Sequence, residues 1–322
     1  MTTTRPPLIR DLYTADPSAH VFEGRVYIYP SHDLDQDLEE NALGDHFAMT
    51  DYHVFSQETP EGPVTDHGEV LHVDQVPWAA RQMWAPDAAC RDGRFYFYFP
   101  AKDRYGVVRI GVAIAPRPEG PFTPDPEPIP GTFSIDPCAF PDDDGDFLLY
   151  LGGLWGGQLQ RWRSGSYDPT AAENPSGDGP ALCPKVARLS DDMRRLATPA
   201  QDLVILDEEG EPLKASDNAR RFFEGPWMHK YQETYYFSYS TGDTHFLCYA
   251  TGESALGPFQ YRGRFLSPPV GWTTHHSIVE FQGRWYLYYH DASLSGGVTH
   301  KRCVKVQELL YEEDGSIRPM EP

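Results

Sequence analysis

The sequence predicts an all-β protein folded as a five-bladed β-propeller, with four-stranded antiparallel blades around a central axis. Two repeats support this prediction: a hairpin pattern that recurs five times, and a Gly-Pro turn that recurs three times. The 28 Gly and 30 Pro also favour short strands joined by turns over long helices. No stretch looks like a linker, so we expect residues 1–322 to form a single domain.

The hairpin pattern consists of two β-forming stretches joined by a short polar turn. Its clearest copy is DPSAHVFEGRVYIYPSHD, at residues 16–33, with the turn at Glu23-Gly24. Tyr and Phe are concentrated in the second stretch of the copies. The other four copies lie at residues 85–103, 136–153, 224–243 and 275–292.

The Gly-Pro turn supplies the outer part of the repeated unit. It occurs as ETPEGPVTD, RPEGPFTP and ALGPFQYR, at residues 58–66, 117–124 and 255–262. The second and third copies follow a β-rich run, so a unit consists of a hairpin, a third strand, the turn and an outer strand. Four strands per unit and five units describe a five-bladed propeller.

A β-sandwich whose hairpins resemble one another in composition is the alternative fold. The five hairpins open in equal register, which favours radial repetition instead. In a propeller the innermost strands crowd the axis, and the residues at their starts converge on one face. Residues that are far apart in the sequence would then share one pocket.

The residues at the five hairpin openings indicate the chemistry of that pocket. They are Asp16, Ala85, Asp136, Glu224 and His275. Three carboxyl groups in one pocket raise the pKa of at least one of them, because like charges and burial both disfavour ionisation. A protonated acid beside an ionised base is what glycoside hydrolysis requires.

The charge of the chain limits its partners. The formal net charge is −21 at pH 7, so the protein would repel nucleic acids and anionic membranes. A neutral substrate such as a carbohydrate fits this charge better than a polyanion. We therefore expect a neutral oligosaccharide partner, with no nucleic acid and no membrane.

The cysteines and the first residues bear on the cellular compartment. The five Cys are scattered and show no metal-binding spacing, so we expect reduced and mostly buried thiols. The stretch MTTTRPPLIRDLY has no apolar core of the kind found in signal peptides. These features predict a cytoplasmic protein.

The chain resembles glycoside hydrolase family 43, a family of five-bladed propeller glycosidases, from about residue 12 to residue 318. Each motif is weak alone, but their order and spacing are specific. The matching segments are Ala15-Asp16-Pro17-Ser18, Trp84-Ala85-Pro86-Asp87, Ile135-Asp136-Pro137, Phe223-Glu224-Gly225-Pro226, Thr274-His275-His276-Ser277 and the tail from Arg302 to Ile317.

The resemblance implies roles for the three carboxyl groups. Asp16 would be the general base that activates water, Glu224 the general acid, and Asp136 the residue that raises the pKa of the acid and orients it. The family inverts the anomeric carbon, so a water molecule must fit between base and acid. Their carboxyl groups should then lie roughly 6.5–9.5 Å apart.

The resemblance also implies a cation and a sugar pocket. His275 matches a His that helps to hold a divalent ion, commonly Ca²⁺, near the axis. Because Ca²⁺ prefers oxygen ligands, we expect a hydrated ion beside His275. A neutral, hydrogen-bonded His275 without an ion is the alternative.

The expected substrate-binding residues are mostly aromatic. Trp84 and Arg302 match pocket residues of the family, the Trp suiting a sugar ring and the Arg its hydroxyl groups. A surface position for Arg302 is the alternative. Trp155, after a Gly-Gly pair, is a second candidate for a sugar contact, and Phe223 could keep the acid dry.

The resemblance therefore predicts an inverting exo-glycosidase, a β-xylosidase with α-L-arabinofuranosidase activity, acting on xylan-derived oligosaccharides. Two other classes of protein remain open at this point. One is an endo-acting arabinanase or another propeller glycosidase, which would need an open groove. The other is a catalytically inactive propeller that binds carbohydrate.

Overall fold

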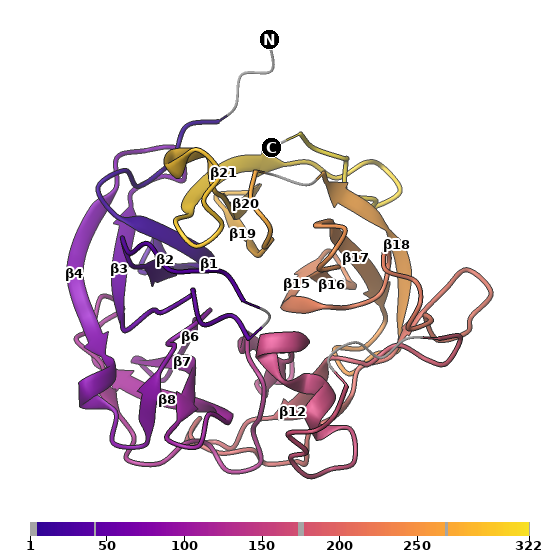
Figure 1. The fold of residues 1–322 in the computed structure, drawn as a ribbon. Helices are drawn as coiled ribbons and strands as arrows, with labels where there is room; N and C mark the ends of the chain where they lie inside the picture. The colour runs from indigo at the N-terminus through magenta and orange to yellow at the C-terminus, as the bar shows by residue number, and fades with distance from the viewer. Residues whose placement is uncertain (1–4, 42, 173–176, 268–269, 322) are drawn as a thin grey trace.

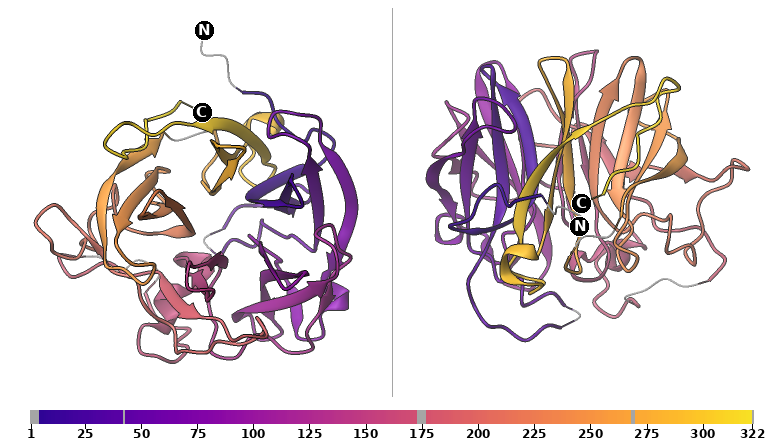
Figure 2. Two further views of the ribbon diagram at one scale, coloured as in Figure 1. Left: turned by 180° about the vertical axis from the view of Figure 1, so that it is seen from behind. Right: turned by 90° about the horizontal axis from the view of Figure 1, so that it is seen from above.

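The computed structural model describes residues 5–41, 43–172, 177–267 and 270–321. Its strands form five sheets that stand as blades around a central axis (Figure 1). Figure 2 shows the same ring from behind and from above. The predicted five-bladed propeller is confirmed, and a two-layer sandwich is excluded. No helix in the described part of the chain is long and apolar enough to cross a membrane.

The blades are numbered in chain order, and their strands are as follows. Blade one contains β1 (Tyr13–Phe22), β2 (Arg25–Asp33), β3 (Asp51–Gln57) and β4 (Thr65–His72). Blade two contains β5 (Ala79–Arg81), β6 (Asp87–Arg91), β7 (Arg94–Asp103), β8 (Val108–Ala115) and β9 (Thr123–Pro124). Blade three contains β10 (Cys138–Pro141), β11 (Phe147–Leu151), β12 (Lys185–Arg188) and β13 (Gln201–Asp202).

The remaining elements complete the ring. Blade four contains β14 (Ile205–Leu206), β15 (Glu224–Tyr231), β16 (Thr234–Ser240), β17 (Leu247–Gly252) and β18 (Phe259–Leu266). Blade five contains β19 (His276–Phe281), β20 (Arg284–Asp291) and β21 (Cys303–Leu309). Short 3-10 helices lie between strands: η1 (Val73–Gln75), η2 (Trp155–Gly157), η3 (Leu159–Trp162) and η4 (Ser293–Ser295).

The five predicted hairpins are the pairs β1–β2, β6–β7, β10–β11, β15–β16 and β19–β20. In the first of them Phe22 pairs with Arg25, and the two turn residues have φ of 52° at Glu23 and 78° at Gly24. Two successive positive φ angles give a turn whose twist matches that of the flanking strands. The sequence of this turn therefore explains why the strands pair here.

The three Gly-Pro turns precede β4, β9 and β18, which are the third-to-outer connections that the repeat predicted. The strand number per blade is less regular than expected. Within the described residues blades two and four have five strands each, and blade five has three.

The beginning of the chain lies against the last blade. The N–H of Leu8 donates a hydrogen bond of 2.8 Å to the carbonyl oxygen of Val304. The N–H of Thr14 donates another, of 3.0 Å, to the carbonyl oxygen of Arg302. These bonds attach the start of β1 and the segment before it to β21 and its approach, and so they join blade one to blade five.

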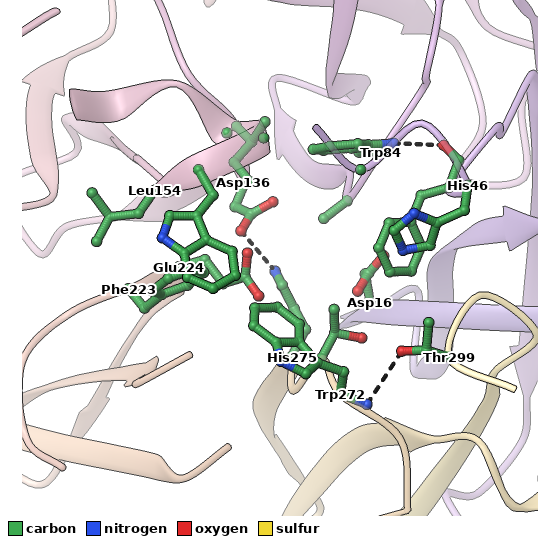
Figure 3. A pocket seen from close by; sticks show the side chains of 18 of the residues that line it. Asp16, His46, Trp84, Asp136, Leu154, Phe223, Glu224, Trp272, His275 and Thr299 are labelled. Carbon is green, nitrogen blue, oxygen red and sulfur yellow. Dashed lines mark hydrogen bonds and ion pairs between the residues drawn. The ribbon is translucent and has the colours of Figure 1, made fainter. Parts of the chain in front are cut away.

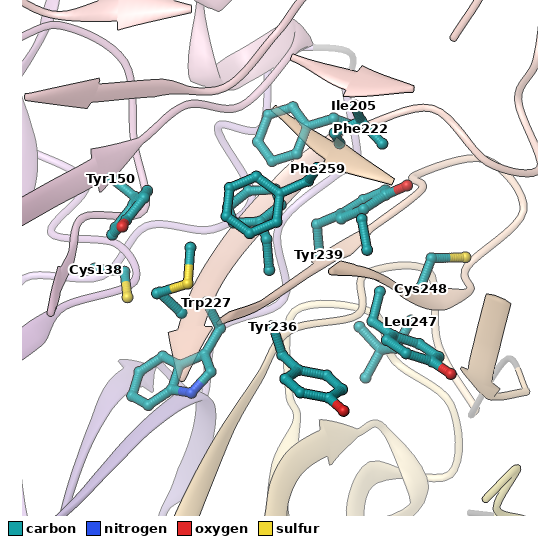
Figure 4. Close-up of a cluster of buried hydrophobic side chains, with 14 of the residues drawn as sticks. Cys138, Tyr150, Ile205, Phe222, Trp227, Tyr236, Tyr239, Leu247, Cys248 and Phe259 are labelled. Atoms are coloured by element: carbon teal, nitrogen blue, oxygen red, sulfur yellow. The ribbon is translucent and has the colours of Figure 1, made fainter. Parts of the chain in front are cut away.

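The hydrophobic core lies between neighbouring blades. Figure 4 shows the largest cluster, which includes Tyr150 of blade three and Trp227 and Phe259 of blade four. Burial of each such side chain stabilises the fold by roughly 1.5–3 kcal/mol. The polar tips are also paired: Tyr150 Oη donates to the carbonyl oxygen of Ala255, and Trp227 Nε1 to that of Ile278. These clusters hold the blades at fixed angles to the axis.

The cysteines are free thiols, as predicted. Cys138, Cys248 and Cys303 are buried, and Cys90 and Cys183 are partly buried.

Candidate active site

The five hairpin openings meet in one pocket on the axis, with a volume of about 400 Å³. Asp16 lies on one side of this pocket, and Asp136 and Glu224 lie on the other (Figure 3). The four substrate-binding residues expected from the sequence reach the same pocket, which brings all the predicted site residues together. The pocket is lined by Asp16, Ala85, Asp136, Glu224 and His275, and by Trp84, Trp155, Phe223 and Arg302.

Asp16 lies at an irregularity inside β1 rather than at the first residue of the strand. The pairing of β1 with β2 shifts register between Ala15 and Ser18, and Asp16 has a φ of 49°. An L-residue in this left-handed region is uncommon and costs about 1–3 kcal/mol, although Asp tolerates it better than most. The bulge turns the Asp16 carboxyl group out of the sheet and toward the axis.

The neighbours of Asp16 favour its ionised form. Arg302 Nη1 donates a hydrogen bond of 3.0 Å to Asp16 Oδ1, and the hydroxyl of Ser31 donates to Oδ2. The backbone N–H of Asp16 donates to His290 Nδ1 at 2.9 Å. Burial tends to raise the pKa of Asp16, but Arg302, His290, His275 and Ser31 together lower it to about 2.

Glu224 is the first residue of β15, and its pKa is shifted in the direction opposite to that of Asp16. Burial raises its pKa, and the negative charge of Asp16 adds to this effect, while Arg302 acts in the other direction. The result is a pKa of about 8. At neutral pH the pocket therefore holds an ionised Asp16 and a protonated Glu224.

Asp136 is the third carboxyl group, and it also has a positive φ, of 58°. Its Oδ2 accepts a hydrogen bond of 2.8 Å from the N–H of Gly225, the residue after Glu224. Burial and the charges of Glu224 and Asp16 raise the pKa of Asp136 well above its usual range. The charge of Glu224 thus acts on the pKa of Asp136, whereas burial, Asp16 and Arg302 determine the pKa of Glu224.

Arg302 lines the pocket, but most of its hydrogen-bonding capacity is used within the protein. Nε and Nη2 bind both carboxylate oxygens of Asp33, at 2.8 and 2.7 Å, and Nη1 binds Asp16 and Thr273. These bonds use four of the five N–H donors of a guanidinium group. The geometry makes Arg302 chiefly a partner of Asp16, with one N–H left for a ligand.

His275 lies just before β19, and its two ring nitrogens have no hydrogen-bond partner among the described residues. Nε2 is 3.8 Å from Asp136 Oδ2, which is too long for a hydrogen bond. Burial lowers the pKa of His275, which leaves a neutral ring with a free lone pair. A buried imidazole of this kind needs a partner from solvent, a ligand or an ion.

Aromatic side chains form the walls of the pocket. Trp84 Nε1 donates to the carbonyl oxygen of Phe47 at 2.8 Å, and the two rings meet edge to face. On the other side Trp155 stacks on Trp272 with ring centroids 5.3 Å apart, and it meets the ring of Phe223 edge-on. Such flat apolar faces suit the C–H face of a sugar ring.

A glycine leaves room for one of these rings. Gly242 has a φ of 74°, and a Cβ atom there would lie only 2.3 Å from the ring of Phe223. Any larger residue at this position would displace the ring of Phe223, which lines the pocket.

A loop between β2 and β3 closes one side of the pocket, which Glu40, Asn41 and Phe47 line from this loop. Gln82 Nε2 donates to the carbonyl oxygen of Gly44 at 2.8 Å, and His300 Nε2 lies 3.0 Å from the carbonyl oxygen of Gln36. Blades two and five thus hold a loop that belongs to blade one.

The sequence did not reveal several residues of the site. They lie on this loop, at the far ends of hairpins or between motifs, where no repeat marks them. The missed residues include Ser31, Asp33, Phe47, Trp272 and His290.

Comparison with known proteins shows which family the chain resembles. The family model for glycosyl hydrolases family 43 matches residues 70–317. Xylosidase/arabinosidase 43A of Humicola insolens is 59% identical, with 98% of this chain and 99% of that protein covered. A xylosidase/arabinosidase of Bacteroides ovatus is 52% identical, with 100% and 99% covered.

A solved structure is also similar over nearly the whole chain. It is a family 43 β-xylosidase/α-arabinofuranosidase from a compost microbial metagenome, in complex with xylotriose and in a calcium-free form. The identity is 56%, the TM-score is 0.97, and 98% of this chain and 97% of that chain are covered.

The propeller fold and its pocket of paired carboxyl groups define the class as glycoside hydrolases. Within that class, the chain belongs to glycoside hydrolase family 43. The family match begins at residue 70, and the full-length relatives extend the likeness to the part that contains Asp16.

Proposed function

We propose that this chain is an inverting exo-glycosidase that releases xylose, and also arabinofuranose, from xylan-derived oligosaccharides. The observation that carries the proposal is the opposite displacement of two pKa values in one pocket, to about 2 at Asp16 and about 8 at Glu224. The names of the relatives and the xylotriose bound to the similar enzyme support the choice of sugar.

In the proposed reaction Asp16 is the general base and Glu224 the general acid. Asp16 removes a proton from a water molecule, whose oxygen attacks the anomeric carbon. Glu224 gives its proton to the glycosidic oxygen as the bond from carbon to that oxygen breaks. The products are a sugar of inverted anomeric configuration and a shortened oligosaccharide. Proton exchange with solvent then restores the ionised base and the protonated acid.

Asp136 would act on Glu224 through the main chain and through charge. Its hydrogen bond to Gly225 fixes the beginning of β15, where Glu224 stands. The two buried carboxyl groups would also oppose each other's ionisation, so that ionisation of one would favour the protonated form of the other.

The shape of the pocket supports cleavage at a chain end. We infer that its lower part is closed, because His276 and Ser277, which follow the opening residue of blade five, are fully buried. The rim loop closes one side as well, since Gly44 is held by Gln82. A blind pocket accepts the terminal sugar of a chain, whereas an endo-acting arabinanase needs an open groove. Trp84 and Trp155 would contact that terminal sugar, with Phe223 beside the acid.

We also propose that a hydrated divalent cation, Ca²⁺, binds near the axis beside His275. The two unpartnered nitrogens of this buried ring fit such a neighbour. Because Ca²⁺ prefers oxygen ligands, His275 would act through bound water, and Asp136, whose Oδ2 lies 3.8 Å from His275 Nε2, would offer a carboxyl oxygen nearby. When bound, the cation would supply a fixed positive charge at the base of the pocket.

The test of the proposed function uses aryl β-D-xyloside, aryl α-L-arabinofuranoside and xylobiose, each with added Ca²⁺ and with EDTA. We expect cleavage of all three substrates, and α-xylose as the first sugar released from the aryl β-D-xyloside by NMR. The Asp16→Asn variant should lose about 10²–10⁴-fold on all three substrates. Initial release of β-xylose, or full turnover by Asp16→Asn, would refute the mechanism. Equal activity with Ca²⁺ and EDTA would remove the cation from it.

A further inference from the structure

A second group of metal-binding side chains lies in blade one, and none of its members lines the axial pocket. It consists of His32 at the end of β2 and Asp51 and His53 at the start of β3, and we call it the His–Asp–His cluster. Each residue offers one ligand atom, and these atoms all lie within 4.8 Å of one another. The sequence did not single out this cluster, because its members come from two strands separated by a loop.

Strand geometry explains why the three side chains meet. The register of β2 and β3 sets Ile28 opposite Phe55, and continued along both strands it sets His32 opposite Asp51. His53 follows Asp51 by two residues, and so it points to the same face of the sheet. Two residues at i and i+2 on one strand, with a third across from them, form a three-sided set of ligands. Neighbouring strands hold the set in place, because His32 pairs with Thr14 of β1, and Asp51 and His53 pair with residues of β4.

The distances suit a small divalent ion. His32 Nδ1 is 2.7 Å from Asp51 Oδ2, and His53 Nε2 is 3.8 Å from the same oxygen. Bonds of about 2.0–2.1 Å in a tetrahedral zinc site place ligand atoms about 3.3 Å apart, between these two values. Metal binding would replace the proton that His32 Nδ1 donates to Asp51, and small rotations of the His32 and His53 rings would complete the geometry.

Asp66 of β4 prepares His53 for a metal. Its two carboxylate oxygens lie 3.1 and 3.3 Å from His53 Nδ1, which must donate a hydrogen bond because a carboxylate can only accept. The neutral tautomer set by this bond has its free lone pair on Nε2, the nitrogen that faces Asp51. A carboxylate behind a His is the usual outer partner of a metal-binding imidazole.

The carboxylates of the cluster have imidazoles as their charged partners in the described part of the chain. Asp51 is nearly buried, and across the residues that the structure describes neither Asp51 nor Asp66 forms an ion pair with a Lys or Arg. His32 and His53 each keep part of their side chain exposed, at 16% and 18%. A cation could thus enter from solvent and keep one position open to water.

We propose that the His–Asp–His cluster is a binding site for one divalent transition-metal ion, with zinc as the best match. Two imidazoles and one carboxylate favour zinc and its neighbours in the first transition row over Ca²⁺, which takes oxygen ligands. The ion joins β2 to β3, and Asp66 extends the link to β4. The site is separate from the cation proposed beside His275 and does not depend on the glycosidase mechanism.

The experiment is a calorimetric titration of metal-stripped protein with ZnCl₂ in the presence of saturating CaCl₂. The excess Ca²⁺ competes with zinc for the proposed cation position beside His275. A His275→Ala protein shows whether the measured zinc binding depends on that position. We expect one zinc ion per chain in both proteins. The double variant His32→Gln/His53→Gln should bind none, and Asp66→Ala should bind about 10–100-fold more weakly.

The matched control is His67→Gln. His67 lies on β4 next to Asp66 but on the opposite face, where it meets Ser56 and Tyr27. The His67→Gln variant should bind zinc as the native protein does. Zinc at a hundredfold excess over its Kd should also raise the Tm of the native protein by roughly 2–5 °C.

Three results would overturn the proposal: no zinc bound by the native protein, undiminished binding by the double variant, or an equal loss in His67→Gln. If the double variant does not fold, Co²⁺ replaces zinc. The visible absorption of bound Co²⁺ should show imidazole ligation in the native protein and weaken in Asp66→Ala. A spectrum unchanged from that of hydrated Co²⁺ would refute the site.

Discussion

The backbone N–H of Gly225 donates a hydrogen bond of 2.8 Å to Oδ2 of Asp136. The bond joins blade four, one residue after the proposed acid, to the opening of blade three. It gives Asp136 a positioning task that is distinct from its charge, since a neutral oxygen at the same place could accept the same bond. The two tasks can therefore be separated by mutation.

Asp136→Asn and Asp136→Ala should differ in activity. Asn keeps an oxygen for Gly225 and loses the charge, whereas Ala loses both. We expect Asp136→Asn to retain a higher kcat on an aryl xyloside than Asp136→Ala. The alkaline limb of the pH profile of Asp136→Asn should lie at a lower pH than that of the native enzyme. Equal activity of the two variants would show that the bond to Gly225 has no part in catalysis.

Glu224→Gln should separate substrates by their leaving groups. The acid is needed most where the departing alcohol is a poor leaving group, so xylobiose should lose about 10²–10⁴-fold in kcat. An activated nitrophenyl xyloside should lose much less, because it leaves without a proton. Steady-state rates on both substrates check this, and equal losses would assign Glu224 another role.

The pH profile should follow Glu224 on its alkaline side. The acid is competent only while protonated, so kcat/KM should be constant near neutral pH and should fall as pH rises through about 8. Asp16 has a pKa of about 2, so it should become protonated and stop acting as the base only far below neutral pH. A decline centred near pH 5 would mean that neither group controls the profile as proposed.

The buried Glu224 should also lower the stability of the folded protein at neutral pH. Its folded pKa of about 8 lies above the reference value of 4.5, so the unfolded chain releases this proton first as pH rises. Stability is therefore lost between pH 4.5 and 8, by about 3 kcal/mol or less at pH 7. Glu224→Gln should raise Tm at pH 7 and leave it unchanged near pH 4. A Tm difference that does not depend on pH would contradict this.

Arg302→Gln should impair Asp16 rather than sugar binding alone. The change removes the positive charge that lowers the pKa of Asp16, so kcat should fall and the acidic limb should move to higher pH. The control is Lys301→Gln, since in the described part of the chain Lys301 forms ion pairs with the exposed carboxylates of Asp35 and Asp37. Surface pairs of that kind contribute little, and the control should keep native rates. A rise in KM alone would return Arg302 to a purely sugar-binding role.

The sequence predicted the ring and the residues at the hairpin openings because both follow from a repeat. Asp16, Asp136 and Glu224 stand at equivalent places in their hairpins, and radial repetition alone brings them together. Ser31 could have been inferred too, since a hairpin returns its second strand to the level where the first began. Ala15 pairs with Ser31 in β1 and β2.

The rest of the site depends on contacts that no local pattern encodes. Trp272 and Phe47 lie in connections whose paths are set by packing against other blades. The partners of Arg302 were also hidden: the family resemblance implied a sugar contact, whereas in the structure Arg302 forms ion pairs with Asp33 and Asp16. The His–Asp–His cluster required the register of β2 against β3, which the hairpin repeat does not contain.

Because the first blade is attached to the last, the environment of the proposed catalytic base depends on closure of the whole ring. Arg302 and Asp16 are 286 positions apart, and they touch only when blade five meets blade one. Closing so long a loop carries an entropic cost that the interfaces between all five blades must offset. A partly synthesised or nicked chain could bury most of its core and still lack a properly charged base. Hydrolysis of sugar would then begin only at the last step of assembly, and it would be the first property lost when the ring opens.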